Sequence, residues 1–77
     1  MSYKEMRKVF YDDVTKRLKD IARHCYWFEN KKEVAHMLNA KLEGVVDIAY
    51  EFKVIDYEEW FSLIEMIYSA ETEIILA

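Results

Sequence analysis

The sequence contains no proline, a single glycine, a single cysteine and no long hydrophobic run. Because proline and glycine are the residues that most strongly interrupt helices, little in this chain breaks a helix once it has begun. One cysteine excludes an intramolecular disulfide, which favours a reducing compartment. The longest strictly apolar runs, such as residues 25–28, are far too short to cross a bilayer, and the N-terminus is charged and amphipathic rather than a signal peptide. We therefore expect a cytoplasmic protein without a membrane-spanning segment.

The chain is rich in apolar and aromatic residues. Hydrophobic residues make up 53% of the 77 positions, and six Tyr, four Phe and two Trp are present. This composition excludes a disordered chain. We expect one domain, residues 1–77, and a domain this small buries only about 60% of the surface that its unfolded chain exposes. The apolar content exceeds what a minimal bundle needs to fill its centre, which predicts a second buried surface.

Three helix-start signals divide the chain. In each, a side chain that can accept a bond from a free backbone N–H is followed three residues later by a glutamate that can reach back to the cap. The three pairs are Ser2 with Glu5, Asn30 with Glu33, and Asp56 with Glu59. We therefore predict an all-α fold, a small antiparallel three-helix bundle with the second helix in the middle. The predicted helices span about residues 3–28, 31–53 and 57–73.

The apolar residues that follow these starts have helical spacing. In the first helix the predicted inward stripe is Met6, Phe10, Val14, Leu18, Ile21, Cys25 and Phe28. In the third helix the predicted face is Tyr57, Trp60, Phe61, Ile64, Ile67 and Tyr68. Ile55 and Trp60 have the spacing of a hydrophobic staple at the start of the third helix. The tail, residues 71–77, suits a helix or a strand, and we expect a helix to about Glu73 with a frayed end.

The second helix carries two apolar stripes. The first stripe is Val34, Leu38, Leu42, Val45, Ala49 and Phe52, and the second is Met37, Ala40, Gly44 and Ile48. Together they cover more than half of the circumference. A helix that is apolar over so wide an arc is central in its domain or packed against another chain.

No combination of residues points to catalysis. The only ligand-type nitrogen and sulfur groups belong to His24, Cys25 and His36, and their spacing matches no transition-metal motif. Cys25 lies on the inward stripe, which predicts a small buried hydrophobe. The carboxylate pairs lie at polar positions, and Gly44 stands alone rather than in a phosphate-binding loop. We expect no catalytic residue, no metal ligand, no cofactor and no enzymatic activity.

The charges are distributed unevenly. Residues 1–23 carry seven Lys or Arg against four Asp or Glu, and residues 24–77 carry four against eleven. The simplest interpretation is that the basic first helix packs beside the acidic third helix. Two exposed surfaces are the alternatives. The predicted acidic face is Asp56, Glu58, Glu59 and Glu65, and the predicted basic face on the first helix is Lys4, Lys8, Lys16, Lys19 and Arg23.

The wide apolar arc of the second helix and the aromatic excess lead us to predict a non-enzymatic protein-interaction module that forms a homodimer. Within 25–28, an inward Cys25 and Phe28 would leave Trp27 pointing elsewhere, as a candidate anchor. The small residues Ala40 and Gly44, four apart, would allow close approach between helices. The predicted interface residues are Trp27, Met37, Ala40, Gly44, Ile48 and Met66.

Two alternatives follow from the charges. In size and acidity, though in no specific motif, the chain is similar to small proteins of phages and mobile elements that block defence systems. That resemblance implies an acidic inhibitor or mimic that binds a basic groove of a nucleic-acid enzyme through the third helix. The other alternative is a small DNA- or RNA-binding regulator that uses the basic face of the first helix. The net charge of −4, and Glu5 and Asp12 within that face, argue against nucleic acid as a partner.

Overall fold

The computed structural model describes the backbone of residues 2–76 and the side chains of residues 2–73. Helix α1 spans Tyr3–His24, the short 3₁₀ helix η1 spans Cys25–Trp27, α2 spans Lys31–Glu51 and α3 spans Tyr57–Leu76. No strand occurs in the described part of the chain. The predicted all-α, three-helix fold is therefore confirmed.

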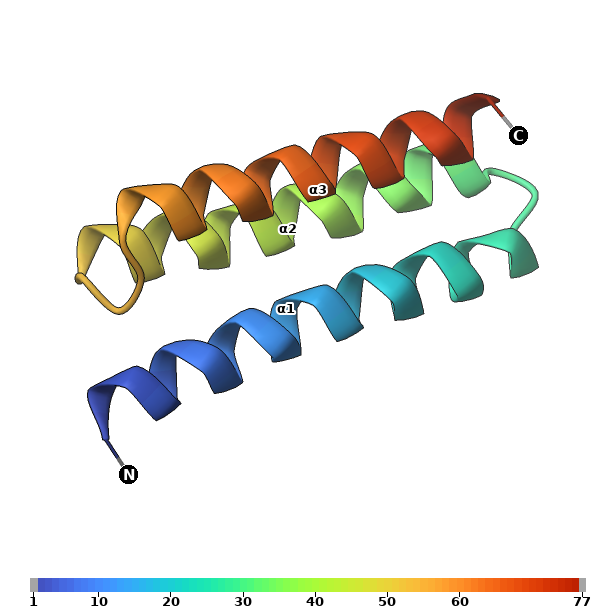
Figure 1. Cartoon of the computed structure of the whole chain (residues 1–77). Helices are drawn as coiled ribbons and strands as arrows, with labels where there is room; N and C mark the ends of the chain where they lie inside the picture. The colour runs from blue at the N-terminus through green and yellow to red at the C-terminus, as the bar shows by residue number, and fades with distance from the viewer. Residues whose placement is uncertain (1, 77) are drawn as a thin grey trace.

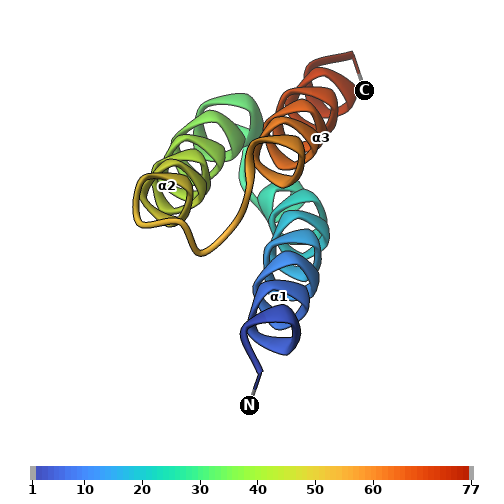
Figure 2. The same cartoon turned by 60° about the vertical axis from the view of Figure 1, so that its left-hand side comes forward.

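Consecutive helices run in opposite directions, as predicted (Figure 1). In both views α2 and α3 lie side by side, and α1 lies along the pair with its N-terminal end further from α2 than its C-terminal end (Figures 1 and 2). Every pair of the three α-helices is in contact, most extensively α2 with α3. The second helix is thus not the middle element, because α1 contacts α3 directly. The molecule is elongated, with principal extents of 42 × 19 × 15 Å.

Two of the three predicted caps form. The Oγ atom of Ser2 accepts from the backbone N–H of Glu5 at 3.1 Å. Asp56 and Glu59 form the full reciprocal pair: Asp56 Oδ1 accepts from Glu59 N at 2.8 Å, and Glu59 Oε1 accepts from Asp56 N at 3.1 Å. Asn30 precedes α2 but its side chain makes no capping hydrogen bond. Its backbone angles, φ −92° and ψ 48°, lie outside the extended region in which an N-cap normally sits, so this cap prediction was wrong.

The predicted helix ends needed correction. Helix α1 stops at His24 rather than at residue 28, because the chain tightens into η1 and Phe28 is extended (φ −107°, ψ 143°). Helix α2 stops at Glu51 rather than at residue 53. Helix α3 continues past Glu73 to Leu76, and Ala77 lies outside the described residues.

A left-handed residue ends α2. Lys53 has φ 61°, a conformation that glycine adopts far more readily. Val54 N donates to Ala49 O at 2.8 Å and Lys53 N donates to Tyr50 O at 3.0 Å. These are the two hydrogen bonds of a Schellman motif, and they satisfy two carbonyls at the end of α2. The turn sends the chain back toward α3.

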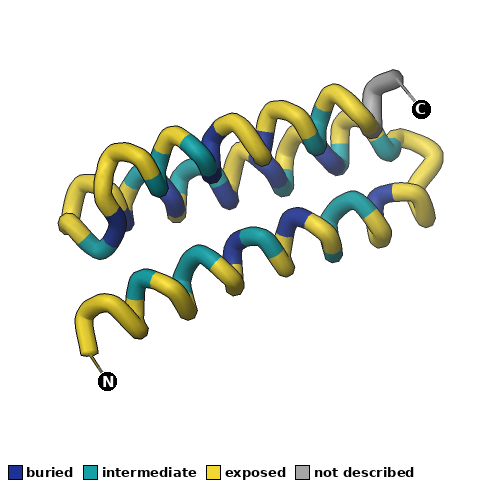
Figure 3. The backbone as a smooth tube through the Cα atoms, in the orientation of Figure 1, coloured by how far each residue is buried: buried dark blue, intermediate teal, exposed yellow. Residues whose placement is uncertain are grey.

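Buried residues line the sides of the helices that face one another (Figure 3). On α2 they recur at intervals of four and three residues, which is the spacing of a helix packed along one narrow seam. The buried residues of α2 are Ala35, Asn39, Leu42, Val46 and Ala49. Only Leu42 and Ala49 belong to a predicted stripe. The predicted stripes therefore lie at a different angle around α2 from the buried residues. The reason is that the buried seam includes Asn39, and a search for hydrophobic periodicity does not count a polar residue.

The predicted stripes of the other helices were partly correct. Of the stripe predicted for the first helix, Val14, Leu18 and Cys25 are buried. Met6 and Phe28 are exposed instead, because the N-terminal end of α1 diverges and the helix ends before Phe28. On the face predicted for the third helix, Ile64 and Ile67 are buried and Trp60 is half-buried. The other aromatic residues of that face are exposed: Tyr57, Phe61 and Tyr68. Ile55 is buried and Trp60 packs against the cluster to which Ile55 belongs, an arrangement that agrees with the predicted staple.

Asn39 is a polar defect in this core. It is 1% exposed, and its Oδ1 and Nδ2 atoms have no hydrogen-bond partner among the described residues. A buried amide without partners lowers stability by about 1–3 kcal/mol relative to a satisfied one. An apolar residue that fits the same space would not carry this penalty.

We predict that Asn39→Val raises the free energy of unfolding by about 1–2 kcal/mol, because it removes the unpaired amide at little change in volume. Thermal and urea unfolding followed by circular dichroism measure the change. Asn39→Asp is the control of the same shape, and it should destabilise the protein strongly because it buries an unpaired charge. A valine variant no more stable than the wild type would show that the amide is satisfied in solution.

Candidate interaction surfaces

The outer face of α2 is apolar and uncovered. Met37, Ala40, Gly44 and Ile48 lie on the side of the helix opposite its buried stripe, since Gly44 is about 160° from Val46 at 100° per residue. Met37 is 52% and Ile48 is 57% exposed. A Cβ atom added to Gly44 would meet nothing within 4 Å. The close approach that we predicted at Ala40 and Gly44 therefore does not involve α1 or α3.

An open groove between α1 and α2 continues this surface. Its volume is about 610 Å³. Its apolar lining consists of Phe10, Val14, Ile21, Leu38, Leu42 and Val45. Val45 is half exposed and lies between the groove and the outer face, so the two form one continuous apolar area. Charged residues edge the groove, among them Asp20 on α1 and Lys41 on α2.

The structure does not bring all six predicted interface residues together. Trp27 lies in η1 and is the most exposed of the large apolar side chains, at 84%. Met66 lies on α3 and lines a different groove, between α1 and α3. Its sulfur receives the O–H group of Tyr11, with 3.9 Å between Oη and Sδ. Only the four α2 residues, described above as the outer face of α2, form one surface.

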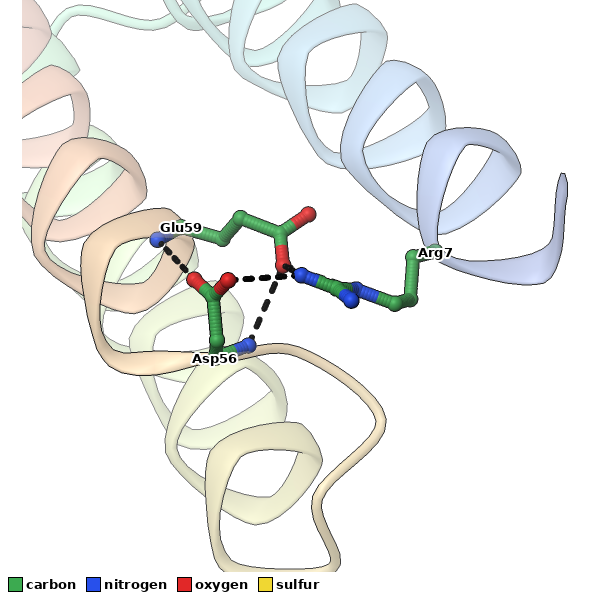
Figure 4. A network of polar contacts seen from close by, with 3 residues as sticks. All are labelled: Arg7, Asp56 and Glu59. Atoms are coloured by element: carbon green, nitrogen blue, oxygen red, sulfur yellow. Dashed lines mark hydrogen bonds and ion pairs between the residues drawn. The ribbon is translucent and has the colours of Figure 1, made fainter. Parts of the chain in front are cut away.

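Arg7 joins the start of α1 to the start of α3 (Figure 4). Its Nε donates to Glu59 Oε1 at 2.9 Å, and its Nη2 donates to Asp56 Oδ2 at 2.6 Å and also to Glu59 Oε1. Because Asp56 and Glu59 also cap α3, one guanidinium ties α1 to both members of that cap. This is the packing of the basic first helix against the acidic third that the charge distribution predicts.

The cap and the ion pair shift the pKa values of this cluster. The pKa of Asp56 is lowered, chiefly because its carboxylate accepts from the backbone N–H of Glu59 and also because Arg7 is beside it. The pKa of Arg7 is raised, mainly by its hydrogen bond to Glu59. Two residues of the predicted acidic face, Asp56 and Glu59, are therefore engaged within the chain. Glu58 and Glu65 are exposed, and neither forms an ion pair among the described side chains.

The predicted basic face of α1 is exposed along its length. None of its five side chains forms an ion pair within residues 2–73. They are Lys4, Lys8, Lys16, Lys19 and Arg23. Asp12 is exposed on the same helix, and Lys4, Lys8 and Asp12 line one shallow groove together with Glu59. Acidic side chains therefore interrupt the positive surface of α1.

A cluster of aromatic rings lies where the end of α2 meets the start of α3. Tyr50 lies 5.4 Å from Trp60 and 6.3 Å from Tyr57, and Tyr57 lies 6.2 Å from Phe61, between ring centroids. Trp60 Nε1 donates to Asp47 Oδ1 at 2.7 Å. The α3 rings could be expected from their helical spacing. Tyr50 could not, because its position depends on how α2 pairs with α3.

The groups considered for chemistry are dispersed. Cys25 is buried and its Sγ contacts the carbonyl oxygen of Ala22 at 3.4 Å, so it behaves as a core residue. His36 pairs with Glu71, and His24 edges the α1–α2 groove. Within the described residues, no three His, Cys, Asp or Glu side chains converge as they would around a metal ion. Among those residues, no helix combines the length and apolar character needed to cross a membrane.

Comparison with protein-family models, curated proteins and solved structures finds no match to this chain. The fold is a small all-α three-helix bundle.

We predict that Arg7→Ala lowers the melting temperature more than Arg17→Ala does. Arg7 is 30% exposed and binds two carboxylates on another helix, whereas Arg17 is 64% exposed and pairs only with Asp13 one turn away. An exposed pair within one helix contributes little to stability. Thermal unfolding by circular dichroism compares the two variants. Equal melting temperatures would mean that the Arg7 contacts contribute nothing to the docking of α1.

We also predict that the stabilising effect of the Asp56 carboxylate is lost in acid. Its pKa is lower in the folded protein than in the unfolded chain, so the effect is fully present above about pH 4 and disappears as the pH falls through the folded value. Asp56→Asn keeps a capping acceptor but does not titrate. The wild type should melt above this variant at pH 7, and the difference should shrink between pH 4 and pH 2. A difference that is constant with pH would contradict the prediction.

Proposed function

We propose that this protein is a non-enzymatic interaction module that forms a homodimer through the outer face of α2. The proposal rests on the environment of Gly44. This glycine lies in the middle of α2 and faces outward, and no other part of the chain comes within 4 Å of a Cβ atom placed on it. Glycine within a helix costs about 0.5–1 kcal/mol relative to alanine. A contact in which another backbone approaches closely gives a physical reason for glycine at this position.

The extent of uncovered apolar surface supports the same proposal. Among the described side chains, fifteen large hydrophobic residues are exposed, against eleven hydrophobic residues that are buried. Single exposed apolar residues are ordinary, but contiguous apolar areas mark sites of association. The outer face of α2 and the α1–α2 groove form such an area. A two-fold dimer would cover it with the same area of a second chain.

The mode of association follows from the shape of this face. Small residues at 40 and 44 lie between the larger side chains of Met37 and Ile48 along the helix. Two such faces can pack with the large side chains of one chain beside the small residues of the other. Lys41 lies on the same side, and its methylene groups can cover apolar surface while its amino group reaches solvent.

We expect the wild type to sediment as a dimer at micromolar concentration, and Ile48→Lys to sediment as a folded monomer of 9.3 kDa. The lysine places a charge in the proposed contact. Val9→Lys is the control, because Val9 is 55% exposed on α1 and does not line the α1–α2 groove. Analytical ultracentrifugation gives the masses. A wild type that remains monomeric defeats the proposal, as does an equal loss of dimer in both variants.

Gly44→Ala separates folding from association. At concentrations at which only monomer is present, it should raise the free energy of unfolding by about 0.5–1 kcal/mol, because the added methyl group meets nothing within the chain. At higher concentration it should weaken the dimer, because that methyl group then holds two helices apart. If it stabilises the monomer and leaves dimerisation unchanged, the contact does not involve Gly44.

A further inference from the structure

A second surface, distinct from the outer face of α2, combines exposed aromatic rings with carboxylates. On α3, Tyr57, Phe61 and Tyr68 are 58%, 46% and 53% exposed. They form a row along the solvent side of the helix, at spacings of four and seven residues. Glu58 and Glu65 lie three residues before and four residues after Phe61, so their carboxylates flank that ring on the helix surface.

Acidic groups of α2 lie on the other side of the aromatic row. Glu43 Oε1 accepts from the O–H group of Tyr68 at 3.1 Å, and this hydrogen bond is the main reason why the pKa of Tyr68 is raised. Asp47 Oδ1 accepts from Trp60 Nε1 at 2.7 Å. The aromatic row therefore lies between two acidic margins, one on each helix.

Basic residues are nearly absent from the part of the sequence that forms the end of α2 and all of α3. Residues 42–77 contain nine Asp or Glu and one basic residue, Lys53, in the turn after α2. The other cations of the chain are on α1 and on the first part of α2, and Arg7 is already engaged by Asp56 and Glu59. The aromatic–acidic surface is defined as Tyr57, Glu58, Phe61, Glu65 and Tyr68. Lys19 of α1 lines a groove together with Glu65, but neither Glu58 nor Glu65 forms an ion pair among the described side chains, so the negative charge of this surface is unpaired.

We propose that this surface binds an arginine-rich segment of a partner protein. A guanidinium can lie flat on an exposed ring while its N–H groups bond to a carboxylate beside that ring. The Phe61 ring is stacked on Tyr57 on one side, with 6.2 Å between centroids, and offers this combination on its remaining side, with Glu58 before it and Glu65 after it on the helix. Glu58 and Glu65 are separated by about 10.5 Å along the helix axis, so side chains about three residues apart in an extended peptide reach both of them.

The partner chemistry follows from charge and from ring contact together. A neutral apolar partner would leave the flanking carboxylates desolvated and unpaired, and an anionic partner would be repelled. Lysine can pair with the carboxylates, but its compact ammonium does not stack on a ring as a planar guanidinium does. The surface therefore favours arginine over lysine.

Nona-arginine and nona-lysine peptides are the probes, with binding measured by isothermal titration calorimetry at low and at physiological ionic strength. We expect nona-arginine to bind several-fold more tightly than nona-lysine. Phe61→Ala should weaken nona-arginine binding by about three- to tenfold without changing the net charge. The matched control is Phe28→Ala, which removes a ring that is 52% exposed elsewhere on the molecule, and it should leave binding unchanged.

The carboxylates are tested in the same way. Glu58→Gln should weaken binding and reduce its dependence on salt. Glu33→Gln is its control, since both glutamates are exposed and lie in the first turn of their helices. If Phe61→Ala and Phe28→Ala bind alike, and the two glutamine variants also bind alike, binding reflects net charge alone and the proposal is wrong.

Self-association is measured in parallel. Suppose that the wild type forms a dimer, that added salt dissociates it, and that Phe61→Ala forms none. The occupant of this surface is then the basic face of α1 in a second copy, and the proposal of a separate partner is overturned. The variants at Ile48 and Gly44 act on another face of the molecule. The failure of one proposal is therefore distinguishable from the failure of the other.

Discussion

The orientation of α2 about its own axis determines which of its side chains face α1 and α3, and the remaining features of the structure depend on it. The buried seam at Ala35, Asn39, Leu42, Val46 and Ala49 leaves the opposite side of the helix, with Met37, Gly44 and Ile48, in solvent. It also turns Glu43, Asp47 and Tyr50 toward α3, where they meet Tyr68, Trp60 and Tyr57. Both of the surfaces proposed for interaction therefore depend on how α2 is turned toward the other two helices.

The core that results is small. Helices of about twenty residues each bury one narrow stripe, and most of the aromatic residues remain outside it. Polar contacts supplement this packing at the end of the molecule where α1 diverges from α2. There Arg7, Asp56 and Glu59 combine an ion pair with a helix cap, so the same atoms both start α3 and hold α1 against it. Such clusters act locally and do not enlarge the core.

The number and order of the helices could be predicted from the sequence because those signals are local. The cap at Asp56 needs only neighbouring residues and is present, and Ile55 and Trp60, the predicted staple pair, belong to one apolar cluster. The rotation of α2 could not be predicted, because periodicity counts apolar residues and the seam includes Asn39. The pairing of Asp56 with Arg7 could not be predicted either, because nothing in the spacing of the sequence shows that the two residues lie close together. The exposure of Met37 and Ile48 agrees with the expectation that three helices cannot hide the whole apolar arc.

The elongated shape has a consequence for how the molecule moves in solution. Its long axis of 42 Å is more than twice either of the others, and its radius of gyration of 13.1 Å exceeds the value of about 11.5 Å typical of a compact chain of this length. Such a body tumbles faster about its long axis than end over end, and its friction is that of a larger sphere. A single chain would therefore leave a gel-filtration column early, at a volume that resembles that of a heavier particle.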